Sequence, residues 1–96
     1  MPPIDVVAVI AVKPGSESIV EKTLRALAES SRADHGCLAY DLFASDSVPG
    51  TLVTIEKWQS QEDIDAHMAS PHMAAALAAV GDHFDGFPAI HHLRSL

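Results

Sequence analysis

The segment EKWQSQEDIDAHMASPH, residues 56–72, gathers several side chains that could do chemistry. Glu56 and Trp58, the only tryptophan, stand two residues apart and would share one face of a strand. His67 and His72 follow on either side of a Ser-Pro break. A tryptophan beside a carboxylate could floor a pocket for a flat aromatic ring, and a neutral imidazole could remove a proton from a hydroxyl group. The segment predicts either a reaction site or an ordinary strand-to-helix junction.

Each of these four side chains has a structural alternative. The indole N–H of Trp58 could hold a developing oxyanion, or its ring could close the core. Glu56 could contact a substrate, although a structural salt bridge or a hydrogen bond to a helix end suits it better. His67 could act as a base, or it could hold the corner between two helices through a backbone carbonyl. His72 follows a proline in a first helical turn, where the helix dipole disfavours a cation, and is either a pocket residue or a cap.

Three residues elsewhere in the chain complete the candidate site. Tyr40 lies in an expected strand with Leu38 and Leu42 on its face, and its hydroxyl could donate to a substrate oxygen or lie in the core. Met73 and Phe84 are expected to form apolar walls, which would serve a pocket and a core equally well. The candidate site thus comprises His67, Trp58 and Tyr40 as catalytic groups, with His72, Glu56, Met73 and Phe84 as substrate contacts.

The sequence favours a site without a metal or other cofactor. The Ser-Pro break removes the helical i, i+4 spacing that would let His67 and His72 share an ion. The chain also has no glycine-rich nucleotide-binding motif and no G-x-S-x-G motif. Cys37, the only cysteine, has no base nearby in the sequence and is expected to be a small buried hydrophobe.

The pattern of apolar and turn residues predicts one α+β domain over residues 1–96. Its order, β-α-β-β-α-β, is the ferredoxin-like arrangement. A capping box at Ser18 and Glu21, or a cap at Ser16, would begin the first helix. Ser60 and Ser70 would cap the two helices on either side of the break. The expected elements are strands at 4–12, 37–45, 51–59 and 89–96, and helices at 16–31, 60–68 and 70–84.

The first expected strand indicates how the chain associates. Residues 4–12 are apolar and largely β-branched, which is typical of a strand buried on both faces. One layer of helices covers only one face of the sheet, so a second copy of the chain is expected on the other. The hydrophobic content of 48% is also higher than so short a chain needs for one core. We therefore expect a homodimer.

These motifs together resemble a known family. The strand GCLAYDLF, the strand end TIEKW and the segment SQEDIDAHMASPHMAAALA are similar to the antibiotic biosynthesis monooxygenase superfamily. The resemblance covers roughly residues 4–95 and rests on Glu-x-Trp, a His after a short helix, and Ser-Pro-His. It implies a dimeric α+β barrel with a small apolar cavity in each subunit. Many members resemble quinol or anthrone oxygenases that use O2 without flavin, haem or metal.

One branch of that superfamily degrades haem, and its residue pattern is not matched here. Members of that branch have an Asn in the first strand, a Trp at the end of the third strand and a His in the last helix. This chain has the tryptophan, Trp58, but Ala8 and Leu77 stand at the other two positions. Haem degradation is therefore not expected.

The sequence thus predicts a cofactor-independent monooxygenase that oxidises a small quinol, naphthol or anthrone-like ring with O2. His67 would take the hydroxyl proton, and Tyr40 or His72 would assist. Two alternatives stay open. A small-metabolite isomerase would use the same groups without O2, and a non-catalytic module would capture a small apolar ligand.

Charge and cysteine content limit the other partners. Thirteen acidic and six basic residues give a net charge of −7, which argues against nucleic acid and against an anionic membrane surface. The single cysteine fits a reducing compartment, and no basic segment followed by an apolar one suggests a signal peptide. We expect a cytoplasmic protein.

Overall fold

The computed structural model describes residues 2–96, which form one four-stranded sheet and a layer of helices. The order of elements along the chain is β-α-β-β-α-α-β with one short 3₁₀ turn before the last strand. The helix expected to be broken by Ser70-Pro71 is indeed two helices. The elements are β1 (Ile4–Ala11), α1 (Glu17–Arg32), β2 (Cys37–Ala44), β3 (Thr51–Trp58), α2 (Gln61–Met68), α3 (Pro71–Val80), η1 (Gly81–His83) and β4 (Ala89–Leu93).

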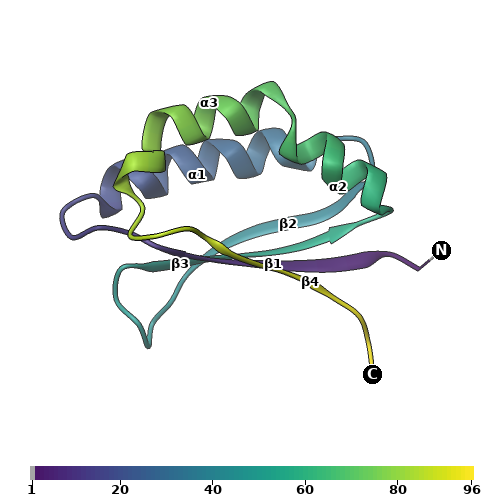
Figure 1. Cartoon of the computed structure of the whole chain (residues 1–96), viewed down its shortest axis with the longest axis horizontal. Helices are drawn as coiled ribbons and strands as arrows, with labels where there is room; N and C mark the ends of the chain where they lie inside the picture. Colours follow the sequence, from purple (N-terminus) through teal and green to yellow (C-terminus); the bar gives the residue numbers. More distant parts are fainter. Residues whose placement is uncertain (1) are drawn as a thin grey trace.

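The predicted ferredoxin-like α+β fold is confirmed. The strand order is β2-β3-β1-β4, and every neighbouring pair is antiparallel. Figure 1 shows all three helices on one side of the sheet, with α1 and α3 next to each other and α2 beyond them. The core fills the space between this helical layer and the sheet. The opposite face of the sheet carries no helix.

The two helices after β3 begin where the sequence predicts. The Ser60 hydroxyl accepts from the backbone N–H of Asp63 at 3.2 Å, and the Ser70 hydroxyl accepts from that of Met73 at 3.3 Å. Such caps satisfy N–H groups that have no partner within the helix, and each contributes about 1 kcal/mol. The Ser70 hydroxyl also donates to the carbonyl of His67 at 2.6 Å, so the break is a fixed corner.

The expected capping box at Ser18 is wrong. The helix α1 begins at Glu17 with Ser16 as its N-cap residue, so Ser18 already lies inside the first turn. The Ser16 hydroxyl caps nothing and instead pairs with Nδ1 of His83 at 2.9 Å. A long-range contact has therefore replaced the local hydrogen bond that the sequence suggests.

A β-bulge at the start of β2 corrects the predicted neighbours of Tyr40. Cys37 pairs with Trp58 in the sheet, whereas Ala39 pairs with Lys57, so Leu38 is the extra residue. Leu38 is half exposed, and Cys37 packs against the cluster that contains Tyr40 and Trp58. Strict alternation assigned Leu38 to that cluster because an inserted residue leaves no mark in the sequence pattern.

The first strand is buried on one face only within a single chain. Val6, Ala8 and Ile10 point under the helices and are buried, whereas Val9 on the opposite face is 38% exposed. The expectation of burial on both faces is therefore not met within one chain. The outer face also exposes other large apolar side chains, namely Phe43, Ile55 and Leu93.

No helix within residues 2–96 combines the length and the apolar character that crossing a membrane requires.

Candidate functional site

A cavity of about 680 Å³ lies between the helices and the helix-facing side of the sheet. All four strands supply its floor, and α1, α2 and α3 supply its roof. The segment that joins η1 to β4 closes one end. Most of the lining is apolar, and this wall includes Ile10, Leu24, Leu27, Met73, Phe84 and Ile90.

Five of the seven candidate site residues line this cavity. Tyr40, Glu56, His67, Met73 and Phe84 all contribute to its wall, and all five are buried. The structure therefore brings together residues from β2, β3, α2 and α3 and from the turn after η1. The sequence pattern placed four of them on these elements but could not show that they meet. It put Phe84 at the end of a helix expected at 70–84, whereas α3 ends at Val80 and Phe84 follows η1.

Trp58 lies behind the cavity instead of lining it. Its side chain is 0% exposed, and its ring packs against that of His67 with centroids 4.7 Å apart. Its indole N–H donates to Oε1 of Glu56 at 2.9 Å. An N–H that is already bonded to a carboxylate is not free to hold an oxyanion. This placement fits the structural alternative, in which the Trp58 ring closes the core, and Trp58 supports His67 from behind.

Glu56 is held by residues of its own strand. Thr54, Glu56 and Trp58 share the helix-facing side of β3, as the alternation predicts. The Thr54 hydroxyl donates to Oε2 at 2.6 Å, and the Trp58 indole donates to Oε1. Each carboxylate oxygen thus has a neutral donor two residues away. This arrangement suits the structural role that the sequence favoured for Glu56, although the side chain also borders the cavity.

Tyr40 presents a phenol that keeps its proton. Burial, together with the negative charge of Glu56, raises the pKa of Tyr40 well above its usual range. Its ring lies 5.6 Å from the His67 ring, centroid to centroid. Tyr40 borders the cavity next to His67 and stays protonated, so it can donate a hydrogen bond but cannot serve as the base.

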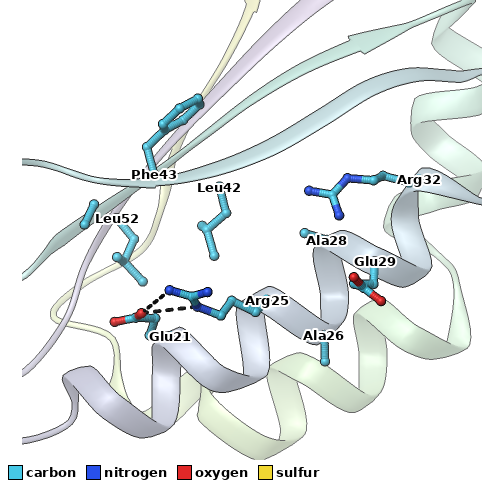
Figure 2. Close-up of a pocket in the computed structure, with 10 residues that line it drawn as sticks. Glu21, Arg25, Ala26, Ala28, Glu29, Arg32, Leu42, Phe43 and Leu52 are labelled. Carbon is cyan, nitrogen blue, oxygen red and sulfur yellow. Dashed lines mark hydrogen bonds and ion pairs between the residues drawn. The ribbon is translucent and has the colours of Figure 1, made fainter.

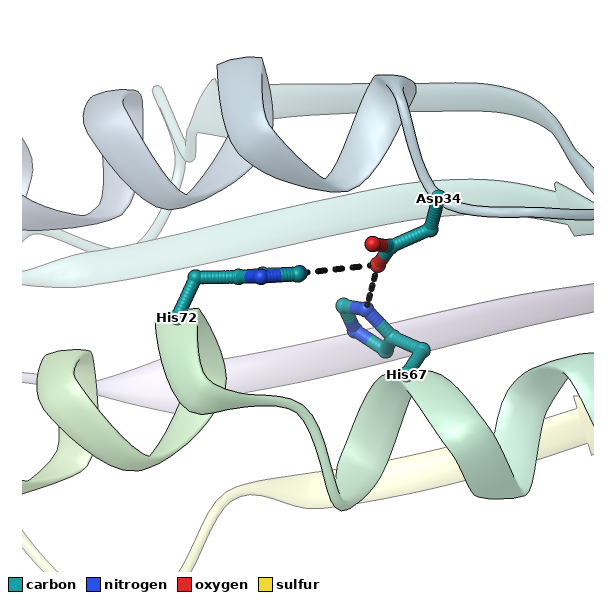
Figure 3. A group of neighbouring side chains, drawn as sticks. All are labelled: Asp34, His67 and His72. Atoms are coloured by element: carbon teal, nitrogen blue, oxygen red, sulfur yellow. Dashed lines mark hydrogen bonds and ion pairs between the residues drawn. The ribbon is translucent and has the colours of Figure 1, made fainter.

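His67 and His72 converge on one carboxylate, that of Asp34 (Figure 3). Nδ1 of His67 and Nε2 of His72 each lie 2.9 Å from Oδ2 of Asp34. The three side chains come from α2, α3 and the connection between α1 and β2. His67 is 3% exposed, whereas the His72 side chain is 27% exposed. His72 lies outside the lining of the large cavity and borders a small hollow between α1 and α3 instead.

The shared carboxylate decides which nitrogen of each ring carries hydrogen. An ionised carboxylate only accepts hydrogen bonds, so Nδ1 of His67 and Nε2 of His72 are the donors. In neutral His67 this leaves Nε2 with a free lone pair, on the part of the ring that points away from Asp34 in Figure 3. His67 borders the cavity, so Asp34 holds it in the tautomer that a general base requires.

Asp34 is the residue that sequence reasoning missed. It lies in the segment RADHG, between the helix expected at 16–31 and the strand expected at 37–45. Nothing in its spacing relates it to His67, 33 residues later, or to His72. The structure also corrects the argument against a shared ion. The Ser-Pro break does abolish the helical pair, yet ligand atoms of Asp34, His67 and His72 lie within 4.8 Å of one another.

A second hollow lies between α1 and β2, away from these histidines (Figure 2). It measures about 490 Å³ and is bordered by Arg25, Arg32, Phe43 and Leu52. Arg25 bonds Glu21 at 2.7 Å with both side chains largely in solvent. Such a surface groove holds no buried group that could act as a base.

Comparison with known proteins identifies the family. The family model described as antibiotic biosynthesis monooxygenase matches residues 3–79. The chain belongs to the antibiotic biosynthesis monooxygenase family. The Mycobacterium tuberculosis protein "Putative monooxygenase Rv0793" is 35% identical to this member over 80 residues, which are 83% of this chain and 78% of that protein. The Bacillus subtilis protein "Putative monooxygenase YcnE" is 31% identical over 71 residues, which are 74% of this chain and 75% of that protein.

Solved structures place this family member among close structural relatives. The structure of Rv0793 superposes with a TM-score of 0.90 at 33% identity, covering 99% of this chain and 96% of that one. A Caulobacter crescentus structure, described as a "putative antibiotic biosynthesis monooxygenase", gives a TM-score of 0.91 at 30% identity and covers 98% of this chain and 90% of that one. The resemblance suggested by the Glu-x-Trp and Ser-Pro-His motifs is thereby confirmed.

Proposed function

We propose that this family member is a cofactor-independent monooxygenase that oxidises a small aromatic quinol, naphthol or anthrone-like molecule with O2. One observation carries the proposal. Asp34 holds Nδ1 of the buried His67, which leaves Nε2 as an acceptor on a residue that borders a largely apolar cavity. An imidazole in that state is suited to deprotonating a phenolic hydroxyl group.

The chemistry needs little else from the protein. His67 takes the hydroxyl proton, and the electron-rich anion that results gives its electrons to O2. A C–O bond forms at a ring carbon that bears hydrogen, and the peroxide receives the proton from His67. Loss of one water from this hydroperoxide breaks the O–O bond and leaves a quinone carbonyl. Tyr40 would donate a hydrogen bond to the anion, which its raised pKa allows because the phenol stays protonated.

The cavity wall supports a small apolar substrate over haem. Ala8 and Leu77, the positions at which the haem-degrading pattern needs Asn and His, both border the cavity and offer only hydrocarbon. Met73 and Phe84 supply further apolar wall, as the sequence predicts. A flat ring would be enclosed mainly by such groups. The polar side chains of the lining are those of Lys13, Tyr40, Thr54, Glu56, His67 and Asp82.

The test is O2 consumption on adding a panel of reduced naphthoquinols to purified, metal-stripped protein. Wild type should consume O2 above the rate of autoxidation. His67→Ala should lower the rate by about 10²–10⁴-fold while a non-oxidisable analogue still binds. His35→Ala is the matched control, because this imidazole is fully exposed and does not border the cavity.

The other outcomes point to the two alternatives. Turnover of an enolisable ketone without O2 uptake would replace the oxygenase by an isomerase that uses the same base and donor. Ligand-induced stabilisation without turnover, unchanged in His67→Ala, would leave a binding module. Either result overturns the proposed reaction.

We also propose that two chains pack through their bare sheet faces to form a homodimer. Val9, Phe43, Ile55 and Leu93 are each between 38% and 50% exposed on that face, which is unusual for so many large apolar side chains on one surface. Light scattering at micromolar concentration should give twice the chain mass. Ile55→Asp should give the monomer mass, since it would bury a charge in the interface, and a monomeric wild type would contradict the arrangement.

A further inference from the structure

The cluster of Asp34, His67 and His72 has a property that a role in orienting a base does not require. A single carboxylate would suffice to orient His67. Here a second imidazole converges on the same oxygen, so two ring nitrogens each lie 2.9 Å from Oδ2 of Asp34. Their ligand atoms all lie within 4.8 Å of one another. Ligands bound to one zinc ion at about 2.0–2.2 Å in a tetrahedral site are roughly 3.4 Å apart. That value lies between the 2.9 Å of the two nitrogen–oxygen contacts and the upper limit of 4.8 Å.

The donor set narrows the kind of ion. Two imidazoles and one carboxylate are typical ligands for zinc and neighbouring transition metals. Magnesium and calcium prefer sites made of oxygen atoms alone. The partners are also held in place before any ion arrives, because Ser70 fixes the corner that carries both histidines. Because these ligand side chains are already positioned, binding an ion costs little conformational entropy.

An ion has a route to this cluster that does not cross the substrate cavity. His72 borders the hollow of about 250 Å³ between α1 and α3. Its side chain is 27% exposed, and that of Asp34 is 18% exposed. The innermost ligand, His67, is buried and also borders the large cavity. The cluster therefore connects a surface hollow with the candidate base.

We propose that Asp34, His67 and His72 form a binding site for a divalent transition-metal ion such as Zn²⁺. The ion is coordinated by Nδ1 of His67, Nε2 of His72 and Oδ2 of Asp34. Each nitrogen must release its hydrogen to become a ligand, and each neutral ring takes that hydrogen on its other nitrogen. No net proton is lost, but Nε2 of His67 changes from an acceptor to a donor.

This exchange makes the ion an inhibitor of the proposed reaction. With the ion bound, the second ring nitrogen of His67 carries hydrogen and cannot take a proton from a substrate. Metal binding itself does not depend on the proposed function, whereas inhibition does. The two parts can therefore be tested separately.

The binding test uses Co²⁺ as a spectroscopic probe, followed by competition with Zn²⁺. The metal-stripped wild type should bind one Co²⁺ per chain with the visible absorption of a low-coordinate N/O site. Excess Zn²⁺ should abolish that absorption, and Mg²⁺ should not. His72→Gln and Asp34→Asn should each weaken binding by about tenfold or more, because each removes or weakens a ligand. Both positions are partly exposed, so these variants should stay folded, as circular dichroism would check.

The matched control is His35→Ala. His35 and Asp63 form another imidazole–carboxylate pair 2.8 Å apart, but its imidazole lies in solvent and no third ligand within residues 2–96 joins it. Unchanged Co²⁺ binding in this variant supports the proposed site. Loss of binding in His35→Ala, or full binding in His72→Gln, overturns it, as does the absence of binding by wild type at 100-fold excess of Co²⁺.

Nitrogen-15 NMR of the histidine rings gives a readout independent of turnover. The free protein should show His67 with hydrogen on Nδ1 and Zn²⁺ should move it to Nε2. Zn²⁺ should also slow O2 consumption in wild type. A tautomer change without slowed consumption would contradict the role of His67 as base and leave the metal site standing. Slowed consumption without the tautomer change would contradict the metal site.

Discussion

The carboxylates of Glu56 and Asp34 both lie near His67, and each accepts two side-chain hydrogen bonds. They are nevertheless suited to different roles, one structural and one chemical. Glu56 accepts from the Thr54 hydroxyl and the Trp58 indole, which both keep their protons at any working pH. Asp34 accepts from two imidazoles, and each has a second nitrogen that can gain or lose a proton. A buried, fully bonded carboxylate therefore does not by itself mark a reaction site, and the chemistry of its donors makes the distinction.

Among the residues of the two networks around His67, changing Asp34 has the largest expected effect. Asp34→Asn keeps the shape but offers only one accepting oxygen and adds an N–H group, so the His67 ring loses its enforced tautomer. We expect O2 consumption at saturating quinol to fall by about 10²-fold or more. The free energy of unfolding should change by only about 1 kcal/mol, because the side chain is partly exposed.

His72→Gln is the companion to that variant. His72 shares the carboxylate but does not line the cavity, so its loss should slow the reaction by less than about tenfold. A greater loss in His72→Gln than in Asp34→Asn would reverse the assignment, since it would make His72 the group that the substrate meets.

Glu56→Gln should produce the opposite pattern, a loss of stability with little loss of rate. The amide has one accepting oxygen, so either the Thr54 hydroxyl or the Trp58 indole is left without its acceptor in the core. An unsatisfied buried donor costs about 1–3 kcal/mol, measurable by urea unfolding. Consumption of O2 should stay within about threefold of wild type, which is under about 1 kcal/mol in the barrier. A rate loss as large as that of Asp34→Asn would place Glu56 in the chemistry.

The two networks also differ in how far the sequence could reveal them. Thr54, Glu56 and Trp58 share one face because side chains alternate along a strand, and this needs no knowledge of the fold. The corner between α2 and α3 was equally readable, since Ser60, Ser70 and Pro71 are local signals. Asp34 meets His67 only because the end of α1 lies over the α2–α3 corner, and no local pattern carries that information.

Local signals failed where a distant partner or an extra residue intervened. Ser16 bonds His83 instead of capping α1, and Leu38 is displaced by the bulge at the start of β2. Trp58 was assigned to the pocket because it shares a face with Glu56, but a shared face does not say which side chain lies in front. His67 lies in front of it.

A substitution at Gly36 tests whether the loop that carries Asp34 can be disturbed without changing a residue of the site. Its φ of +77° favours glycine, and an added Cβ would meet the Asp63 side chain at the start of α2. We expect Gly36→Ala to lower the free energy of unfolding by about 1–3 kcal/mol. If the loop holds Asp34 in place, the rate should fall as well, although by less than in Asp34→Asn. A stability loss with full activity would show that Asp34 keeps its position independently of this turn.

The smallest effect concerns His35 and Asp63, which pair like His67 and Asp34 but with the imidazole in solvent. Their hydrogen bond and opposite charge raise the pKa of His35 above its ordinary 6.5. Hydrogen bonds from His35 and Ser60 lower the pKa of Asp63 below its ordinary 3.8. A histidine whose pKa is raised by folding stabilises the fold at low pH. This stabilisation is lost as the pH rises through the raised pKa. A carboxyl group whose pKa is lowered by folding stabilises the fold at higher pH. This stabilisation is lost as the pH falls through the lowered pKa.

The pair should therefore stabilise the fold only at pH values between the lowered pKa of Asp63 and the raised pKa of His35. Urea unfolding of wild type and His35→Gln should differ slightly inside that window and converge above it. NMR titration should also show the pKa of His35 falling toward its ordinary value in Asp63→Asn. Turnover should be the same in wild type and His35→Gln, because neither member of this pair borders the cavity. A rate that changed with His35 would mean that a surface pair can influence the reaction, and the distinction between the two environments would fail.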